Sequence, residues 1–220
     1  MLHDSSMSRN LPQQIRYDKL GPNVVKALKK RHFDAYYCPT KEEALHQAIE
    51  LIPQDDIVSW GGSISINEIG LLPYVKENYH VIDRDTATTQ EERLELMRQA
   101  LLCDTFLMST NAISEDGQLV NIDGNGNRVA AMIYGPKNII VIVGMNKVVK
   151  TLNEAYNRTR NIAAPSVVQR FPNAKTPCNL TGSCADCLSP DSCCAYLVTT
   201  RISRPAHKIK VILVGENLGL

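Results

Sequence analysis

The run of five β-branched residues at 139–143 (IIVIV) is the feature that most restricts the fold. A short, uninterrupted apolar run of this kind is typical of a central strand in a sheet. Other runs that predict strands lie at 33–38, 57–60, 80–83, 104–110, 119–122 and 209–215. Because helical patterns alternate with these strands, we expect an α/β fold with an open, mostly parallel sheet, right-handed crossovers and helices on both faces.

Proline positions suggest where the first and the longest helices begin and end. We expect the first helix to begin near residues 21–22 (Gly-Pro), because proline suits the first turn of a helix. Residues 1–14 would then form a flexible segment, and residues 15–220 a single domain. A long polar helix is expected over 148–163, with its end before Pro165.

Composition and charge exclude several classes of protein. With 44% hydrophobic and 21% charged residues in 220, the chain has the composition and length of a globular domain. Its formal net charge of +1 gives no electrostatic footprint for nucleic acid. No apolar run approaches the length of a membrane span, and residues 1–10 lack the apolar core of a secretory signal, so we expect a cytoplasmic location.

Three polar segments follow strands of the predicted sheet, at 61–63, 110–111 and 121–128. Ligands of open α/β sheets bind beyond the carboxyl ends of the strands. Glycine and asparagine let such segments turn out backbone N–H groups, and an arginine adds a planar fork for phosphate or carboxylate. The predicted anion site consists of Gly61, Gly62, Ser63, Asn111, Asn125, Gly126, Asn127 and Arg128. The alternative is a set of plain tight turns with a surface arginine.

Three charged residues near these segments are candidates for contact with a ligand. Asp123 is a candidate base, and Lys147, just after the strongest strand, either meets an anion or begins the next helix in solvent. Glu68 is a candidate catalytic carboxylate, but it also lies three residues after Ser65, which is the spacing of a capping box. None of the five histidines has a sequence neighbour that suggests a triad or a metal pair.

Five of the seven cysteines lie in the last fifth of the chain. In a cytoplasmic protein, such clustering favours metal binding over disulfides. Cys184 and Cys187 have the two-residue gap with which two thiolates hold one ion, and Cys178, Cys193 and Cys194 flank them. Four thiolates can surround a zinc ion or an iron–sulfur cluster, and spacing does not separate the two. The alternative is a loop of reduced cysteines, with or without a redox disulfide.

In these motifs the chain resembles the lactate-utilisation domain family, the LUD proteins. The resemblance rests on 60–70 (WGGSISINEIG), 110–113 (TNAI), 116–128 (DGQLVNIDGNGNR), 134–137 (YGPK), 161–165 (NIAAP) and the cysteine segment at 172–196. It covers nearly the whole chain from residue 15 onward. The cysteine segment is similar to that of the branch of the family that carries its own cysteine cluster.

The resemblance implies the fold shared by ribose-phosphate isomerases, glucosamine-phosphate deaminases and CoA transferases. Relatives in the family are components of an iron–sulfur system that oxidises L-lactate, and this chain differs from their small subunit in carrying the cysteines. In the cysteine-bearing branch the last ligand falls at the position of Cys194. The resemblance therefore implies Cys178, Cys184, Cys187 and Cys194 as ligands and Cys193 as the spare cysteine.

From these observations we expect a small anionic metabolite as ligand, lactate or a related acid, and an iron–sulfur cluster or a zinc ion as cofactor. A redox partner protein and a homo-oligomer are further expectations. One alternative is a structural-zinc or assembly protein without catalysis. Another is an enzyme that resembles the CoA transferases or phosphosugar isomerases, and CoA transfer would require Glu68 as its nucleophilic carboxylate.

Overall fold

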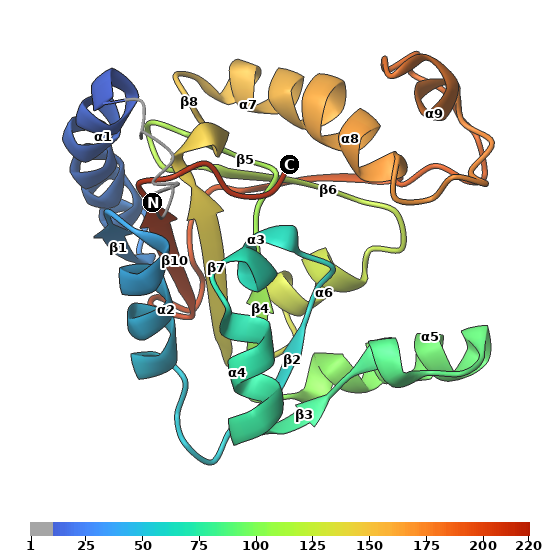
Figure 1. The fold of residues 1–220 in the computed structure, drawn as a ribbon, viewed down its shortest axis with the longest axis horizontal. Coiled ribbons are helices and arrows are strands. Elements are labelled where there is room, and N and C mark those ends of the chain that lie inside the picture. The colour runs from blue at the N-terminus through green and yellow to red at the C-terminus, as the bar shows by residue number, and fades with distance from the viewer. Residues whose placement is uncertain (1–10) are drawn as a thin grey trace, which may run out of the picture.

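The fold is built around a parallel sheet of six strands in the order β1-β10-β7-β4-β2-β3 (Figure 1). The structure is a computed structural model that describes residues 11–220. The strands are β1 (Asp34–Cys38), β2 (Ile57–Trp60), β3 (His80–Ile82), β4 (Thr105–Met108), β7 (Asn138–Gly144) and β10 (Ile209–Val214). Each overlaps a predicted run, and every neighbouring pair is parallel, so the prediction of an open parallel sheet is confirmed.

Strand β7 shows why the sheet is covered on both faces. It lies between β10 and β4, and its successive side chains point to opposite faces. Ile139, Val141 and Val143 belong to one buried hydrophobic cluster, whereas Ile140 and Ile142 belong to another. An uninterrupted apolar run is therefore required here, since neither face of β7 reaches water.

Helices cover both faces of the main sheet, as the sequence predicts. On one face lie α1 (Leu11–Lys30) and α6 (Asn127–Ile133), and on the other lie α2 (Lys41–Glu50), α3 (Ile64–Glu68) and α4 (Leu71–Asn78). Between β3 and β4 the chain forms η1 (Arg84–Thr86), α5 (Gln90–Gln99) and η2 (Ala100–Leu102). Figure 1 shows α5 projecting beyond the edge of the sheet.

The first helix begins earlier than predicted, at Leu11, and passes through Pro22. Proline lacks a backbone N–H and normally interrupts a helix at such a position. In α1 a buried stripe continues across the proline, from Tyr17 to Leu28, and its packing against the sheet outweighs the lost hydrogen bond. Residues 11–14 of the expected flexible segment are therefore helical, and residues 1–10 lie outside the described part of the chain.

A second, smaller sheet has the strand order β8-β5-β6-β9. Its strands are β5 (Ala112–Ser114), β6 (Leu119–Asp123), β8 (Val148–Val149) and β9 (Tyr196–Thr200). The sequence predicts only β6, which is antiparallel to both β5 and β9. Through β6, the second sheet brings Asp123 to the place where β2 and β4 of the main sheet end.

The helix predicted at 148–163 is divided in the structure. The elements are η3 (Met145–Lys147), β8, α7 (Leu152–Arg158), a π-helical turn η4 (Thr159–Ala163) and α8 (Ala164–Val168). Pro165 does not end the helix, because the wider π turn changes the bonding pattern before it. The N–H of Ala164 bonds to the carbonyl of Thr159, five residues back. Helix α7 packs on the second sheet, and α8 leads to the cysteine segment (Figure 1).

The cysteine segment extends beyond α8 and returns to the second sheet as β9. It contains one short helix, α9 (Pro177–Thr181), followed by an irregular loop (Figure 1). Between residues 11 and 220, no helix combines the length and the apolar character that a membrane span requires.

Candidate functional site

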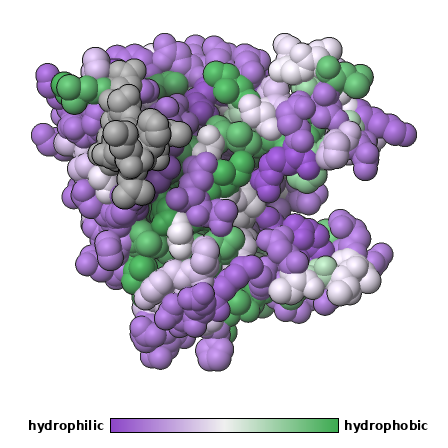
Figure 2. All heavy atoms as spheres, in the orientation of Figure 1, coloured by the Kyte–Doolittle hydropathy of each residue, from purple (hydrophilic) through white to green (hydrophobic). Residues whose placement is uncertain are grey.

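A cavity of about 390 Å³ opens where β2 and β4 end, and the loop after β6 contributes another part of its wall. Figure 2 shows the surface hollowed at this place, between α5 and the α8–α9 region. The predicted residues that line it are Gly62, Ser63, Asn111, Asp123, Asn125, Asn127, Arg128 and Lys147. The three polar segments singled out in the sequence therefore meet at one cavity.

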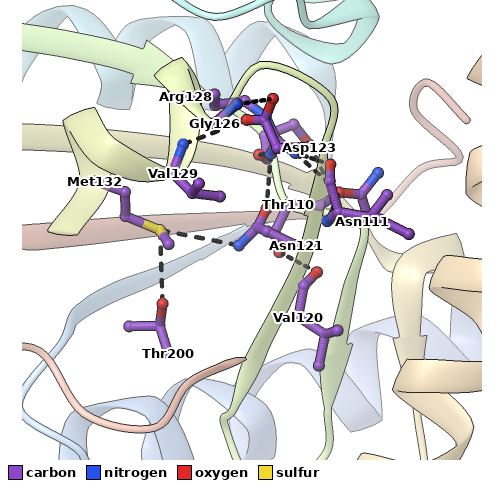
Figure 3. A network of polar contacts seen from close by, with 12 residues as sticks. Thr110, Asn111, Val120, Asn121, Asp123, Gly126, Arg128, Val129, Met132 and Thr200 are labelled. Carbon is purple, nitrogen blue, oxygen red and sulfur yellow. Dashed lines mark hydrogen bonds and ion pairs between the residues drawn. The ribbon is translucent and has the colours of Figure 1, made fainter. Parts of the chain in front are cut away.

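Arg128, in the first turn of α6, is the centre of the polar network in Figure 3. Its Nη1 donates to the carbonyl of Ser109 (2.8 Å) and to Asn121 Oδ1 (2.7 Å). Its Nη2 donates to Asn111 Oδ1 (3.0 Å) and to the carbonyl of Ile122 (2.8 Å). These bonds use the four terminal N–H groups of the guanidinium, so Arg128 joins the end of β4 to β6. To a ligand it offers mainly its charge.

Asp123 closes the glycine- and asparagine-rich loop that leads into α6. Its Oδ1 accepts from the N–H of Gly126 (3.2 Å) and its Oδ2 from the N–H of Val129 (3.3 Å), so the carboxylate caps the start of the helix. Burial lowers the pKa of the Arg128 guanidinium, and the Asp123 carboxylate, 3.7 Å from Nε, opposes that effect. The contacts of Asp123 give it a structural role. Its catalytic role stays a prediction.

Two of the predicted glycines make room for protein side chains. A Cβ atom on Gly61 would come within 2.9 Å of Arg128 Cδ, and one on Gly126 within 3.2 Å of the Tyr196 ring. These glycines therefore let the polar network and β9 pack closely against the loops. Neither glycine lines the cavity, and their anion-binding role stays a prediction.

The cap of α3 differs from the prediction. Ser63 is the capping residue, and its Oγ accepts from the N–H of Ile66 (3.4 Å). Ser65 lies inside the first turn, and the carboxylate of Glu68 accepts from the N–H of Gly219 (2.8 Å). The capping-box interpretation of Ser65 and Glu68 is therefore wrong. Glu68 does not line the cavity, and its catalytic role stays a prediction.

Lys147 lies in η3, directly after β7, and is only 4% exposed. Its Nζ donates to Ser65 Oγ (3.1 Å) on α3 and to Ser109 Oγ (3.2 Å) after β4. The chain near its C-terminal end covers this region, where the N–H of Leu218 donates to Asn146 Oδ1 (3.0 Å). The alternative that Lys147 begins a helix in solvent is therefore wrong, because its side chain is buried and its amine bonds to two neighbouring segments.

The environment of Lys147 disfavours its charged form. Burial lowers its pKa to about 7, the positive charges of Arg158 and Arg128 act in the same direction, and Glu68 opposes them. Near neutral pH, about half of the amine is therefore unprotonated, whereas an ordinary lysine is almost fully charged. A lysine in this state can act as a base or as a nucleophile.

Three arginines that were not among the predicted site residues also line the cavity. They are Arg84 in η1, Arg93 in α5 and Arg170 after α8. A Cβ atom on Gly62 would lie 2.8 Å from Arg84 Nη2 and 4.0 Å from Arg170 Nη1, so both guanidiniums face the main chain of Gly62. One signal was present, since Arg84 follows directly after the predicted strand at 80–83.

The charges around the cavity are strongly unbalanced. The basic side chains that line it are Arg84, Arg93, Arg128, Lys147 and Arg170, against the carboxylates Asp123 and Asp191. Arg84 Nε is buried without a hydrogen-bond partner among residues 11–220. Burial lowers the pKa of Arg84. The carboxylates of Asp85 and Asp123 oppose this effect, whereas the charges of Arg93 and Arg170 add to it. An anionic ligand would offset this repulsion and supply the missing acceptor.

All five clustered cysteines line a second cavity, of about 410 Å³. Apolar residues form much of the rest of its wall, among them Ala164, Pro165, Val168, Leu188 and Leu197. Ile122, Ser192 and Cys193 line both this cavity and the arginine-lined one, so the two are neighbours with a shared wall. Thiolates are the ligands that a zinc ion or an iron–sulfur cluster takes, and here all five thiols border one largely apolar cavity.

The cysteine side chains make local contacts in this structure. Cys194 Sγ lies 2.8 Å from Ser192 Oγ, and Cys178 Sγ lies 3.4 Å from Thr176 Oγ1. Burial, followed by the neighbouring thiols, raises the pKa of Cys193 to about 11. Within residues 11–220, no three histidine, cysteine or acidic side chains are grouped closely enough to hold a metal ion. The predicted ligand set therefore stays a prediction.

Comparison with known proteins identifies a family and finds similar solved structures. A family model described as the LUD domain matches residues 22–214. Among solved structures, a DUF162 family protein from Deinococcus radiodurans is 12% identical, with a TM-score of 0.49. That likeness covers 91% of this chain and 98% of the other. None of the curated proteins compared with the chain matches it.

Proposed function

The chain belongs to the LUD domain family, and from this premise we propose that it takes part in an iron–sulfur-linked oxidation of lactate or a related small organic acid. In this proposal the anionic acid binds in the arginine-lined cavity. The observation that carries the proposal is the wall formed by Ile122, Ser192 and Cys193, which separates that cavity from the one lined by cysteines. A thiolate-held group would therefore lie next to the bound acid.

The arginines favour a carboxylate as the group that is recognised. Arg84 and Arg170 face the main chain of Gly62 from two different segments, and Arg84 Nε lacks a hydrogen-bond partner within the described residues. A planar guanidinium can hold a carboxylate through two parallel hydrogen bonds, and such charge-assisted bonds are stronger than neutral ones. We expect the carboxylate of the acid to bind beside Gly62.

The cysteines are the residues that would hold the cofactor. Cys178, Cys184, Cys187 and Cys194 would be the ligands, and the apolar wall of their cavity would limit the access of water. An iron–sulfur cluster would supply an electron acceptor there, whereas a zinc ion would supply only structural support. Cys193, on the shared wall, would stay free.

Elemental analysis of anaerobically purified protein tests the cofactor. We expect iron and sulfide in the protein, visible absorbance, and loss of both in Cys187→Ser. Cys103→Ser is the matched control, because Cys103 is buried in the main core and burial raises its pKa to about 12. A colourless protein with stoichiometric zinc would contradict the redox role and favour the structural-zinc alternative.

Ligand binding is tested separately, through the fluorescence of Trp60. It is the single tryptophan of the chain, and it lies at the end of β2, next to Gly61. We expect lactate to change this fluorescence in the wild type and to bind at least tenfold more weakly to Arg84→Met. Arg98→Met, an exposed change on α5 outside the cavity, should bind as the wild type does. Equal affinities in all three proteins would contradict the proposed ligand site.

The CoA-transfer alternative loses support from the position of its nucleophile. Glu68 does not line the arginine-lined cavity, and its carboxylate accepts a hydrogen bond from the N–H of Gly219. Covalent attack on an acyl-CoA would require that carboxylate to face the bound ligand. We therefore do not propose this reaction.

A further inference from the structure

Lys147 is a buried amine that the binding of an anion does not by itself explain. Its Nζ contacts two serine hydroxyls, and among residues 11–220 it forms no ion pair with a carboxylate. The charged groups that act on it are Arg158 from α7, Arg128 from α6 and Glu68 from α3. Two of these three are positive, so the site stabilises a neutral amine. A site built only to attract an anion would keep its lysine charged.

Desolvation and neighbouring cations are the two ways in which proteins activate a lysine as a nucleophile. Lys147 has both, because it is 4% exposed and lies near two arginines. With a pKa of about 7, it carries roughly a thousandfold more neutral amine at pH 7 than an ordinary lysine. It also lines the arginine-lined cavity, so a ligand held there can meet it.

We propose that Lys147 is a catalytic nucleophile that forms an imine with the carbonyl carbon of a small 2-oxo acid bound in the arginine-lined cavity. This inference rests on the proposed function, because a 2-oxo acid is the oxidised form of a 2-hydroxy acid such as lactate. The carboxylate would be held by the arginines that face Gly62, as in that proposal. The carbonyl carbon next to it would then be turned toward Lys147.

The reaction is a condensation and needs no oxidant or reductant. The lone pair of Nζ forms a C–N bond to the carbonyl carbon, and the carbonyl oxygen takes up a proton. The amine then gives up its protons, the C–O bond breaks, and one water leaves as the imine forms. Ser65 and Ser109, whose hydroxyl oxygens contact Nζ, are placed to carry protons between nitrogen and oxygen.

Reductive trapping of the full-length protein tests the proposal. Wild-type protein is incubated with pyruvate and then reduced with sodium borohydride. We expect one adduct per chain, with the mass of pyruvate less one oxygen atom, and peptide mapping should assign it to Lys147. The labelling rate should rise with pH around 7, rather than around the ordinary lysine value near 10.4.

Lys208 is the matched control for burial alone. It is 8% exposed, burial also lowers its pKa, and its Nζ donates to the carbonyl of Ile133 (3.0 Å), but it does not line the cavity. We expect at least tenfold less adduct on Lys208 than on Lys147. Lys147→Met should lose the cavity adduct, and circular dichroism should show that it is folded. Because mapping is done on the wild type, the test does not depend on that variant.

The outcomes separate this inference from the proposed function. An adduct confined to Lys147 supports the imine. No adduct on Lys147, or equal labelling of Lys147 and Lys208, overturns it, whether or not pyruvate binds. If the imine proposal is overturned but pyruvate and lactate still change the Trp60 fluorescence, the proposed ligand site remains supported. If neither acid changes the fluorescence and none labels the protein, both proposals fail.

Discussion

Replacement of Arg128 by methionine tests how the cavity is held together. Methionine keeps an unbranched apolar side chain but removes the donors that bond to Ser109, Ile122 and the Asn111 and Asn121 side chains. Breaking a buried charged network by removing one partner costs about 3–5 kcal/mol. Each abandoned acceptor alone would cost about 1–3 kcal/mol, but the cost of burying the guanidinium disappears with it, so the separate losses do not add.

We therefore expect Arg128→Met to lower the free energy of unfolding by about 3–5 kcal/mol. At about 2–4 °C per kcal/mol for a chain of this size, Tm should fall by roughly 6–20 °C. Urea unfolding followed by circular dichroism measures the first quantity, and a thermal scan measures the second. Arg170→Met is the matched control, since Arg170 lines the same cavity but is exposed, and it should change stability by less than about 0.5 kcal/mol. If Arg128→Met is within about 1 kcal/mol of the wild type, the network does not hold β4 and β6 together.

Three further changes test other parts of the site. Gly62→Ala places a Cβ atom 2.8 Å from the flexible end of Arg84, so we expect lactate affinity to fall severalfold in a Trp60 fluorescence titration, with little change in Tm. Ser63→Ala removes the cap of α3 and should lower the free energy of unfolding by about 0.5–2 kcal/mol in urea. For Lys147 the folded pKa is about 7 and the unfolded pKa about 10.4, so the unfolded state binds more protons between these values. Urea unfolding between pH 7.5 and 9.5 should therefore show the wild type gaining roughly 1.4 kcal/mol per pH unit relative to Lys147→Met, and a constant difference would contradict the buried neutral amine.

The main sheet could be predicted because each of its strands has a short apolar run in the sequence. A run such as 139–143 is apolar at every position, which is typical of a strand covered on both faces. The strands β5 and β8 have no such pattern, because they are only two or three residues long and are defined by their hydrogen bonds to neighbouring strands. The helix boundaries predicted at Pro22 and Pro165 are wrong, because tertiary packing in one case and a π-helical turn in the other let the helix continue.

The convergence of the three polar segments on one cavity could be predicted, but the contacts of each residue could not. The segments that follow β2 and β4 meet because the carboxyl ends of parallel strands share one edge, and β6 of the second sheet brings Arg128 to the same place. Arg128 donates hydrogen bonds to protein acceptors, while Arg84 Nε has no hydrogen-bond partner in the described chain, and this difference depends on which acceptors the fold brings near. The sequence shows that an arginine is charged, but only the tertiary structure determines which groups that arginine contacts.

The second sheet explains why the two cavities are neighbours. Strand β6 pairs with β9 in a register that sets Asp123 opposite Tyr196 and Ile122 opposite Leu197. Beyond that pairing, β6 leads into the loop of the arginine-lined cavity, and β9 is the direct continuation of the cysteine segment. A Cβ atom on Gly124 would lie 3.1 Å from Cys193 Cα, so the two segments are in contact beyond the ladder as well. A change in the cysteine segment that moves Cys193 should therefore reshape the wall of the arginine-lined cavity, because Cys193 is part of that wall and packs against the loop at Gly124.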